Sequence, residues 1–173
     1  AMAALKDAIP SAQKDPYRPR YHFCAPARSM GDPHGPIFYG GHYHLFYQLN
    51  PLDDARDSSY WGHARSTDLL HWEHLPIAIG PSEGKGEARC FSGCPITTQD
   101  GRLQLLYTSI GPGYRTHWHT AEQWLAESDQ NLIQWQKYAH NPVIPESIHG
   151  DVKVYDWRDP YTFIHQGETY VVC

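Results

Sequence analysis

The stretch IFYGGHYHLFY, residues 37–47, carries the pattern that decides the fold. Two aromatic-rich apolar runs flank Gly40-Gly41, and a glycine pair between alternating runs is a strong signal for a tight β-hairpin. The same pattern returns twice, over residues 95–107 and 161–172. The sequence therefore predicts a succession of short antiparallel strands.

A second motif repeats in phase with these hairpins. The run STDLLHW, residues 66–72, returns as SDQNLIQW, residues 128–135, and polar turns near Asp32, Ser92 and Asp159 lead the successive units. The period is roughly 60 to 67 residues, and a fixed period of four short strands is typical of a β-propeller. A β-sandwich is the alternative that hairpins alone would allow, but it does not explain the in-phase recurrence. We therefore predict an all-β propeller, with Trp72 and Trp135 in the core of the repeat.

The repeat also defines an expected organisation of the chain. Residues 1–19 are rich in Ala, Lys, Asp and Pro and are expected to form an extended N-terminal arm. Residues 20–173 hold two blades and the opening hairpin of a third, whereas a propeller needs at least four blades to close. We therefore expect an incomplete propeller, whose remainder comes from a longer chain or from a second chain.

Composition excludes several classes of partner. The 14 basic and 19 acidic residues give a formal net charge of -5, without long runs of one sign. This balance argues against a nucleic-acid surface or a polybasic membrane surface. No apolar stretch is long enough to cross a bilayer, and residues 1–14 show no signal-peptide pattern. We expect a soluble protein, with an extracellular or a cytoplasmic location left open.

The four cysteines form neither a disulfide framework nor paired metal motifs, so we expect mostly buried free thiols. The pairs His42/His44 and His117/His119 each place two imidazoles on one strand face, but a third ligand at a clear spacing is missing. The sequence therefore predicts no metal site and no cofactor.

Aromatic residues and histidines are unusually dense, with six Trp, twelve Tyr and twelve His. Sugars stack on aromatic rings and hydrogen-bond to many polar groups, so this composition favours a ring-lined cleft for a small-molecule or oligosaccharide substrate. Equivalent turns of successive blades face the same axis, which would gather Asp32, Ser92, Arg158 and Asp159. Carboxylates grouped in this way suit glycoside chemistry. They would also suit a Ca²⁺ site, although one aspartate per blade supplies few ligands.

The motifs, taken in order, resemble the opening of glycoside hydrolase family 32, which contains invertases, inulinases, levanases and sucrose-6-phosphate hydrolases. The resemblance covers roughly residues 17–173 with correct succession throughout. It rests on MGDPHGP at 30–36, YHLFYQLNP at 43–51, WGHA at 61–64, FSG at 91–93, YT at 107–108 and RDP at 158–160.

This resemblance implies a five-bladed propeller with a retaining β-fructofuranosidase site. Asp32 matches the nucleophile that forms a covalent fructosyl-enzyme. Asp159 matches the residue that grips sugar hydroxyls and stabilises the transition state, with Arg158 holding the carboxylates. The positions that match the lining of the fructose subsite are Gln48, Trp61, Phe91 and Ser92.

Two departures from the family pattern bear on the reaction. The family usually reads Trp-Met-Asn-Asp-Pro-Asn-Gly, where this chain has Gly31 before Asp32 and His34 in place of the second Asn. These changes leave the preferred sugar open. They also leave open whether the reaction is hydrolysis, fructosyl transfer or action on another furanoside. The family's general acid is a glutamate followed by cysteine, and no glutamate here precedes a cysteine. The acid is therefore expected outside this chain, which alone would be weakly active or inactive; an inactive carbohydrate-binding propeller segment is the other alternative.

Overall fold

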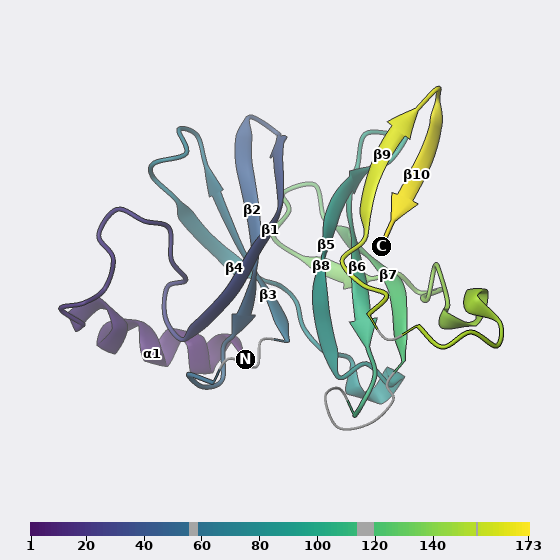
Figure 1. Cartoon of the computed structure of the whole chain (residues 1–173). Coiled ribbons are helices and arrows are strands. Elements are labelled where there is room, and N and C mark those ends of the chain that lie inside the picture. Colours follow the sequence, from purple (N-terminus) through teal and green to yellow (C-terminus); the bar gives the residue numbers. More distant parts are fainter. Residues whose placement is uncertain (56–58, 114–119, 155) are drawn as a thin grey trace. The chain divides into compact units, whose positions relative to one another are not determined.

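The computed structural model describes residues 1–55, 59–113, 120–154 and 156–173. The chain forms two compact units, Ala1–Ala78 and Ile79–Cys173, and each unit is built around one four-stranded antiparallel sheet (Figure 1). The expectation of a mostly β chain of antiparallel hairpins is confirmed.

The first sheet is a meander of four strands that follow one another along the chain. It contains β1 (Ser29–Tyr39), β2 (His42–Asn50), β3 (Tyr60–Ser66) and β4 (Glu73–Ile79), in that spatial order. Tyr39 pairs with His42 across the expected turn at Gly40-Gly41. Both glycines have positive φ, 56° and 81°, the conformation that a two-residue hairpin turn of this kind requires.

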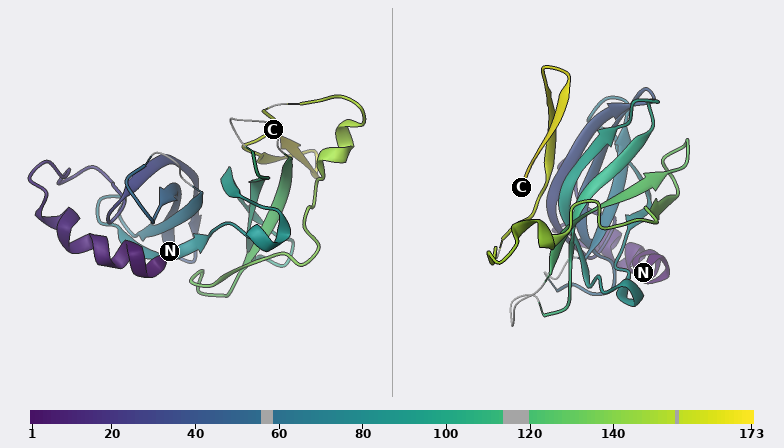
Figure 2. Two further views of the ribbon diagram at one scale, coloured as in Figure 1. Left: turned by 90° about the horizontal axis from the view of Figure 1, so that it is seen from below. Right: turned by 90° about the vertical axis from the view of Figure 1, so that its right-hand side faces the viewer.

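The N-terminal segment is helical, so the extended conformation expected for residues 1–19 is wrong over most of its length. Helix α1 spans Met2–Lys14. Its apolar residues recur at helical spacing and form one face, which packs against the core of the first sheet (Figure 2). The helical residues in this contact are Leu5, Ala8, Ile9 and Ala12, and the core residues are Ala25, Ala27, Tyr47, Leu49 and Ala64. Burial of this face stabilises the helix despite Pro10, and the spacing of the face was already present in the sequence.

The second sheet repeats the meander with a shortened last strand. Its strands are β5 (Arg89–Thr97), β6 (Leu103–Ile110), β7 (Ala121–Ser128) and β8 (Trp135–Lys137). Beyond β8 the chain stays beside β7, because the Asn141 side chain forms two 2.8 Å hydrogen bonds with the backbone of Leu125. The backbone of Gln123 then pairs with that of Ile144. The Asn141 side chain and the loop that follows therefore continue the pairing along β7 beyond the end of the short strand β8.

The repeated motif before the last strand of each sheet is confirmed at the level of hydrogen bonds. The Trp72 indole donates to the backbone oxygen of Leu69 at 3.1 Å, and the Trp135 indole donates to that of Leu132 at 3.2 Å. Both leucines have positive φ, 65° and 58°. Left-handed backbone is unusual for leucine, so its occurrence at both positions shows that the two turns share one conformation.

A third, two-stranded sheet ends the chain. It contains β9 (Tyr161–His165) and β10 (Glu168–Val172), joined by the expected turn at Gln166-Gly167. The side chains are exposed along almost the whole hairpin, whose tip projects beyond the second sheet (Figure 1). Two strands are marginally stable alone, and this sheet has half the width of the other two.

All four cysteines are free thiols, but their burial differs. Cys90 and Cys94 are buried, as expected, whereas Cys24 is half-buried. Cys173 is exposed, so the expectation of burial is wrong there. Within the described part of the chain, no helix has the length and apolar character needed to cross a membrane.

Candidate active site

Asp32 lies in a β-bulge near the start of β1, whereas the sequence placed it in a turn before a strand. Met30 pairs with Leu49 and Pro33 pairs with Tyr47, so Gly31 and Asp32 together oppose the single residue Gln48. A bulge of this kind bends a strand and changes the direction of its side chains. Asp32 is exposed at this point. The local structure therefore presents a carboxylate to solvent from a strand that is paired with β2 both before and after the bulge.

Two predicted subsite residues continue across the sheet from this bulge. Gln48 of β2 is paired with Trp61 of β3, and both residues are buried. The His34 ring lies 4.1 Å from the Trp61 ring, centroid to centroid. Burial lowers the pKa of His34 to about 3, so this imidazole is neutral at ordinary pH. Asp32, Gln48 and Trp61 thus occupy neighbouring positions on three adjacent strands.

The second sheet carries the same irregularity at the corresponding place. Cys90 pairs with Ser109 and Gly93 pairs with Tyr107, so Phe91 and Ser92 oppose one residue of β6. That residue is Thr108. The bulge also depends on glycine, since a Cβ at position 93 would lie 2.0 Å from the backbone oxygen of Leu106.

Thr108 connects this bulge to the Arg-Asp-Pro segment. Its hydroxyl accepts a hydrogen bond from the backbone N–H of Asp159 at 3.0 Å and donates one to the Gln123 side chain at 2.8 Å. Gln123 in turn donates to the backbone oxygen of Trp157 at 3.3 Å. Thr108 and Gln123 are fully buried. The two side chains therefore fix the backbone on both sides of Arg158.

The backbone of the Arg-Asp-Pro segment is left-handed at Asp159. Asp159 has φ of 61°, a region that aspartate tolerates better than most residues but still at a cost. The Arg158 guanidinium lies 3.6 Å from the Asp159 carboxylate and 3.4 Å from that of Asp156. These side chains are all partly exposed. The Arg158 guanidinium thus pairs with two neighbouring carboxylates at once.

The structure brings the predicted site residues into two groups, one in each unit. The first group is Asp32, Gln48 and Trp61, and the second is Phe91, Ser92, Arg158 and Asp159. Sequence reasoning did not assign roles to Thr108, Gln123 or Asp156. The repeat could have identified Thr108, because Thr108 opposes the bulge of the second sheet as Gln48 opposes the bulge of the first.

Glu87 and Lys137 form a buried ion pair next to Cys90, the residue that precedes the second bulge. Glu87 is fully buried, accepts a 2.9 Å hydrogen bond from the Tyr107 hydroxyl and is paired with the ammonium group of Lys137. Burial and the charge of Glu87 raise the pKa of the neighbouring Cys90 thiol well above its usual value. Because Glu87 is paired and inaccessible to solvent, it is unsuited to donate a proton to a substrate.

Histidines of the first sheet are engaged with one another. His44 Nδ1 lies 2.9 Å from His63 Nε2, and both residues are buried. Burial lowers the pKa of both imidazoles, that of His63 to about 3. His44 therefore contacts β3, and its ring also lies edge-to-face with that of His42, 6.2 Å between centroids. The other histidine pair of the sequence, His117 and His119, lies outside the described residues.

Comparison with known proteins gives a consistent result. The N-terminal domain of glycosyl hydrolases family 32 matches residues 22–173. The levanase of Bacillus subtilis is 38% identical over 178 residues, which cover 96% of this chain and 24% of the levanase.

Solved structures agree with the sequence match. A variant of the Bombyx mori β-fructofuranosidase in complex with sucrose superposes with a TM-score of 0.79 at 34% identity, covering 98% of this chain and 35% of that chain. The sucrose-6-phosphate hydrolase of Lactobacillus gasseri gives a TM-score of 0.83 at 30% identity, covering 99% of this chain and 34% of that chain. The chain therefore spans about a quarter to a third of the length of these relatives.

Proposed function

The chain belongs to glycosyl hydrolases family 32, and we propose that the complete protein hydrolyses β-fructofuranosides, such as sucrose or a fructan, by a retaining mechanism. The observation that carries the proposal is the bulge at Asp32. It presents an exposed carboxylate beside a buried amide and a buried indole, Gln48 and Trp61. A carboxylate next to polar and aromatic groups suits attack on a bound sugar ring.

The proposed reaction is a double displacement. The Asp32 carboxylate attacks the anomeric carbon of the fructosyl unit, and the bond to the leaving-group oxygen breaks as that oxygen receives a proton from the general acid. Water then attacks the fructosyl-enzyme, gives its proton back to the acid residue, and releases fructose and free Asp32. The acid is contributed from outside these 173 residues, because no glutamate here stands before a cysteine and Glu87 is buried in an ion pair.

Asp159 and Arg158 act at the same stage in this proposal. Asp159 accepts hydrogen bonds from fructose hydroxyls, which strengthen as positive charge develops on the ring. Thr108 and Gln123 are positioning residues, since they hold the backbone around Arg158 and would not touch the sugar. Phe91 and Ser92 complete the lining of the subsite.

The architecture that we propose for the complete protein is a five-bladed propeller. The two four-stranded meanders would be its first two blades, and β9 with β10 would begin the third. The support is the repetition of the same bulge and the same turn in both sheets. The narrow, exposed third sheet is suited to pair with further strands.

Trapping of the intermediate tests the nucleophile directly. The complete protein is mixed briefly with a fructosyl fluoride, quenched in acid and digested, and the peptide that contains Asp32 is expected to gain the mass of one fructosyl unit. The Asp32→Asn variant should not be labelled, whereas Asp7→Asn, an exposed aspartate on α1, should be labelled as the wild type. Labelling of another peptide in the wild-type protein would refute the assignment of Asp32.

Fructosyl transfer is a second candidate, favoured by the residues that flank Asp32. Gly31 offers no amide side chain to a sugar, and the neutral His34 ring packs on Trp61, so the surroundings of the carboxylate differ from the usual family pattern. Chromatography of the products formed from concentrated sucrose separates the two activities. Oligofructosides would indicate transfer, and equal amounts of glucose and fructose would indicate hydrolysis. Binding of fructose without either product would identify an inactive binding protein.

A further inference from the structure

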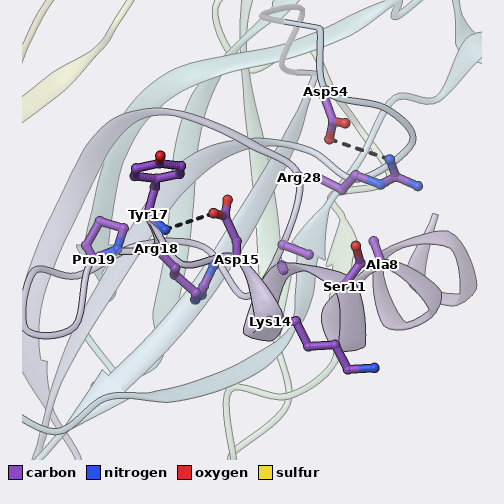
Figure 3. Close-up of a pocket in the computed structure, with 11 residues that line it drawn as sticks. Ala8, Ser11, Lys14, Asp15, Tyr17, Arg18, Pro19, Arg28 and Asp54 are labelled. Atoms are coloured by element: carbon purple, nitrogen blue, oxygen red, sulfur yellow. Dashed lines mark hydrogen bonds and ion pairs between the residues drawn. The ribbon is translucent and has the colours of Figure 1, made fainter.

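A groove of about 670 Å³ lies in the first unit, and Asp32 is not among the residues that line it (Figure 3). The C-terminal half of α1 forms one wall, residues 15–19 form the second, and Ala27, Arg28 and Asp54 close it. Most of these residues precede residue 22, where the match to the family begins. The catalytic function proposed above therefore does not account for the groove.

The charges that line the groove are mixed in sign. Lys14, Arg18 and Arg28 supply three cations, and Asp15 and Asp54 supply two carboxylates. An anion would be repelled by the carboxylates, and a cation by the three basic groups. A neutral ligand that both donates and accepts hydrogen bonds matches this lining better than either ion, and a polyhydroxyl compound has that character.

Two arginine side chains that line the groove are held by contacts within the protein. Arg28 is paired with Asp54 through Nη1 at 3.5 Å, but its Nε is buried and has no hydrogen-bond partner among the residues that the structure describes. Arg18 is fixed differently, since its Nη2 donates to the backbone oxygen of Ala25 at 2.7 Å. Because the Arg28 Nε is enclosed by protein, a ligand in the groove can reach only the exposed part of this guanidinium.

An exposed ring stands at the end of the groove opposite the Arg28–Asp54 pair (Figure 3). Tyr17 is 91% exposed, and its backbone N–H donates to the Asp15 carboxylate at 2.9 Å, which fixes the loop that carries the ring. Pro19 lies beside it. An exposed aromatic ring next to mixed polar groups forms a platform on which the apolar face of a sugar can stack.

The groove is close enough to Asp32 for one ligand chain to reach both. Arg28 directly precedes β1, and Asp32 is the fourth residue of that strand. At a rise of about 3.3 Å per residue, the two backbones lie at most about 13 Å apart. A polymer held in the groove could therefore extend toward the reacting carboxylate within the same unit.

We propose that this groove binds a segment of a β-fructan chain at a distance from the bond that is cleaved. The identity of the sugar rests on the function proposed above, whereas the preference for a neutral polyhydroxyl chain rests on the lining of the groove alone. Tyr17 stacks on the sugar, and the exposed part of the Arg28 guanidinium and the two carboxylates hydrogen-bond to its hydroxyls.

Affinity electrophoresis of the complete protein tests binding without turnover. An Asp32→Asn background prevents cleavage, and migration is compared in gels with and without levan or inulin. We expect the fructan to retard the protein, and Tyr17→Ala to weaken the apparent affinity about five-fold. Ser11→Trp, which places a large side chain in the groove from an exposed helix position, should weaken it as well. Tyr21→Ala is the matched control, because Tyr21 is 85% exposed in the same segment but does not line the groove.

Each result has a separate meaning for the groove and for the proposed function. Equal retardation of the wild type, Tyr17→Ala and Ser11→Trp would overturn the groove proposal. Retardation by a neutral glucan and not by fructan, still dependent on Tyr17, would support the groove and refute the fructan assignment. If inorganic phosphate stabilised the protein against heat more than fructan oligosaccharides do, the proposal that the ligand of the groove is neutral would be wrong. In the active protein, Tyr17→Ala should raise KM for long levan and leave sucrose hydrolysis unchanged.

Discussion

The two four-stranded sheets follow one plan and hold different chemistry. In β1 the bulge at Asp32 opposes Gln48, and in β5, roughly 60 residues further along the chain, the bulge at Ser92 opposes Thr108. The next strand places Trp61 beside Gln48 and Gln123 beside Thr108. The repeat therefore fixes the position of a residue in the sheet, whereas the residue type at that position decides its chemistry.

The difference extends to the buried polar groups of the two units. The first sheet buries neutral imidazoles, including the His44–His63 pair. The second unit buries an ion pair, Glu87 with Lys137, beneath Tyr107. The two units should therefore respond differently to pH and to loss of one polar partner.

The largest expected difference concerns the two bulges. In the complete protein, Asp32→Asn should lower kcat by about 10⁴-fold or more, because the proposed nucleophile is lost. Ser92→Ala should lower kcat/KM by about ten-fold, the effect of one lost hydrogen bond to substrate. Initial rates on sucrose and on a fructan check both values. Equal losses for the two variants would contradict the separate roles of the bulges.

Loss of Lys137 should have the next largest effect. Lys137→Met leaves the Glu87 carboxylate buried without its cation, which should destabilise the second unit by about 3–5 kcal/mol. Adding Glu87→Gln should recover much of this loss, since the buried charge is then removed. Hydrogen exchange read by mass spectrometry locates the effect, which should appear in peptides of residues 79–173 and leave β1–β3 unchanged. Uniform loss of protection over the whole chain would contradict the assignment to one unit.

The two left-handed leucines should respond to glycine with opposite signs. Leu132 is buried, so Leu132→Gly should cost about 2–4 kcal/mol through lost packing. Leu69 is 52% exposed, and Leu69→Gly should stabilise by up to about 1 kcal/mol because glycine adopts positive φ without strain. Urea unfolding of both variants measures the two changes. A change of the same sign in both would show that backbone strain or packing dominates at both turns.

Acid should destabilise the first sheet gradually. His34 and His63 have a pKa of about 3 in the fold, below the usual value of 6.5, so the unfolded chain takes up protons that the folded chain does not. Stability is therefore retained above the usual pKa and falls as pH drops toward 3, by roughly 1.4 kcal/mol per histidine for each pH unit. His63→Gln should reduce this slope between about pH 4 and 6 in denaturant titrations. An unchanged slope would show that His63 does not contribute.

Sequence reasoning was most successful where one local signal was enough. Gly40-Gly41 defined the first hairpin, and the repeated Leu-x-x-Trp turns were confirmed by matching hydrogen bonds. It failed at α1, where composition suggested an extended arm although the apolar residues recur at helical spacing. It also placed Asp32 in a turn, because a bulge is defined by the pairing of two strands and is invisible in one of them.

The hairpins, the repeated turn and the family could be predicted from the amino-acid sequence, since they follow from local patterns and motif succession. Tertiary structure decided the rest. Strand register set Gly31-Asp32 opposite Gln48 and Phe91-Ser92 opposite Thr108, and only the folded chain brought the Asp159 backbone to the Thr108 hydroxyl. The physical reason is that register and long-range hydrogen bonds depend on which segments pack together, and no short stretch of sequence contains that information.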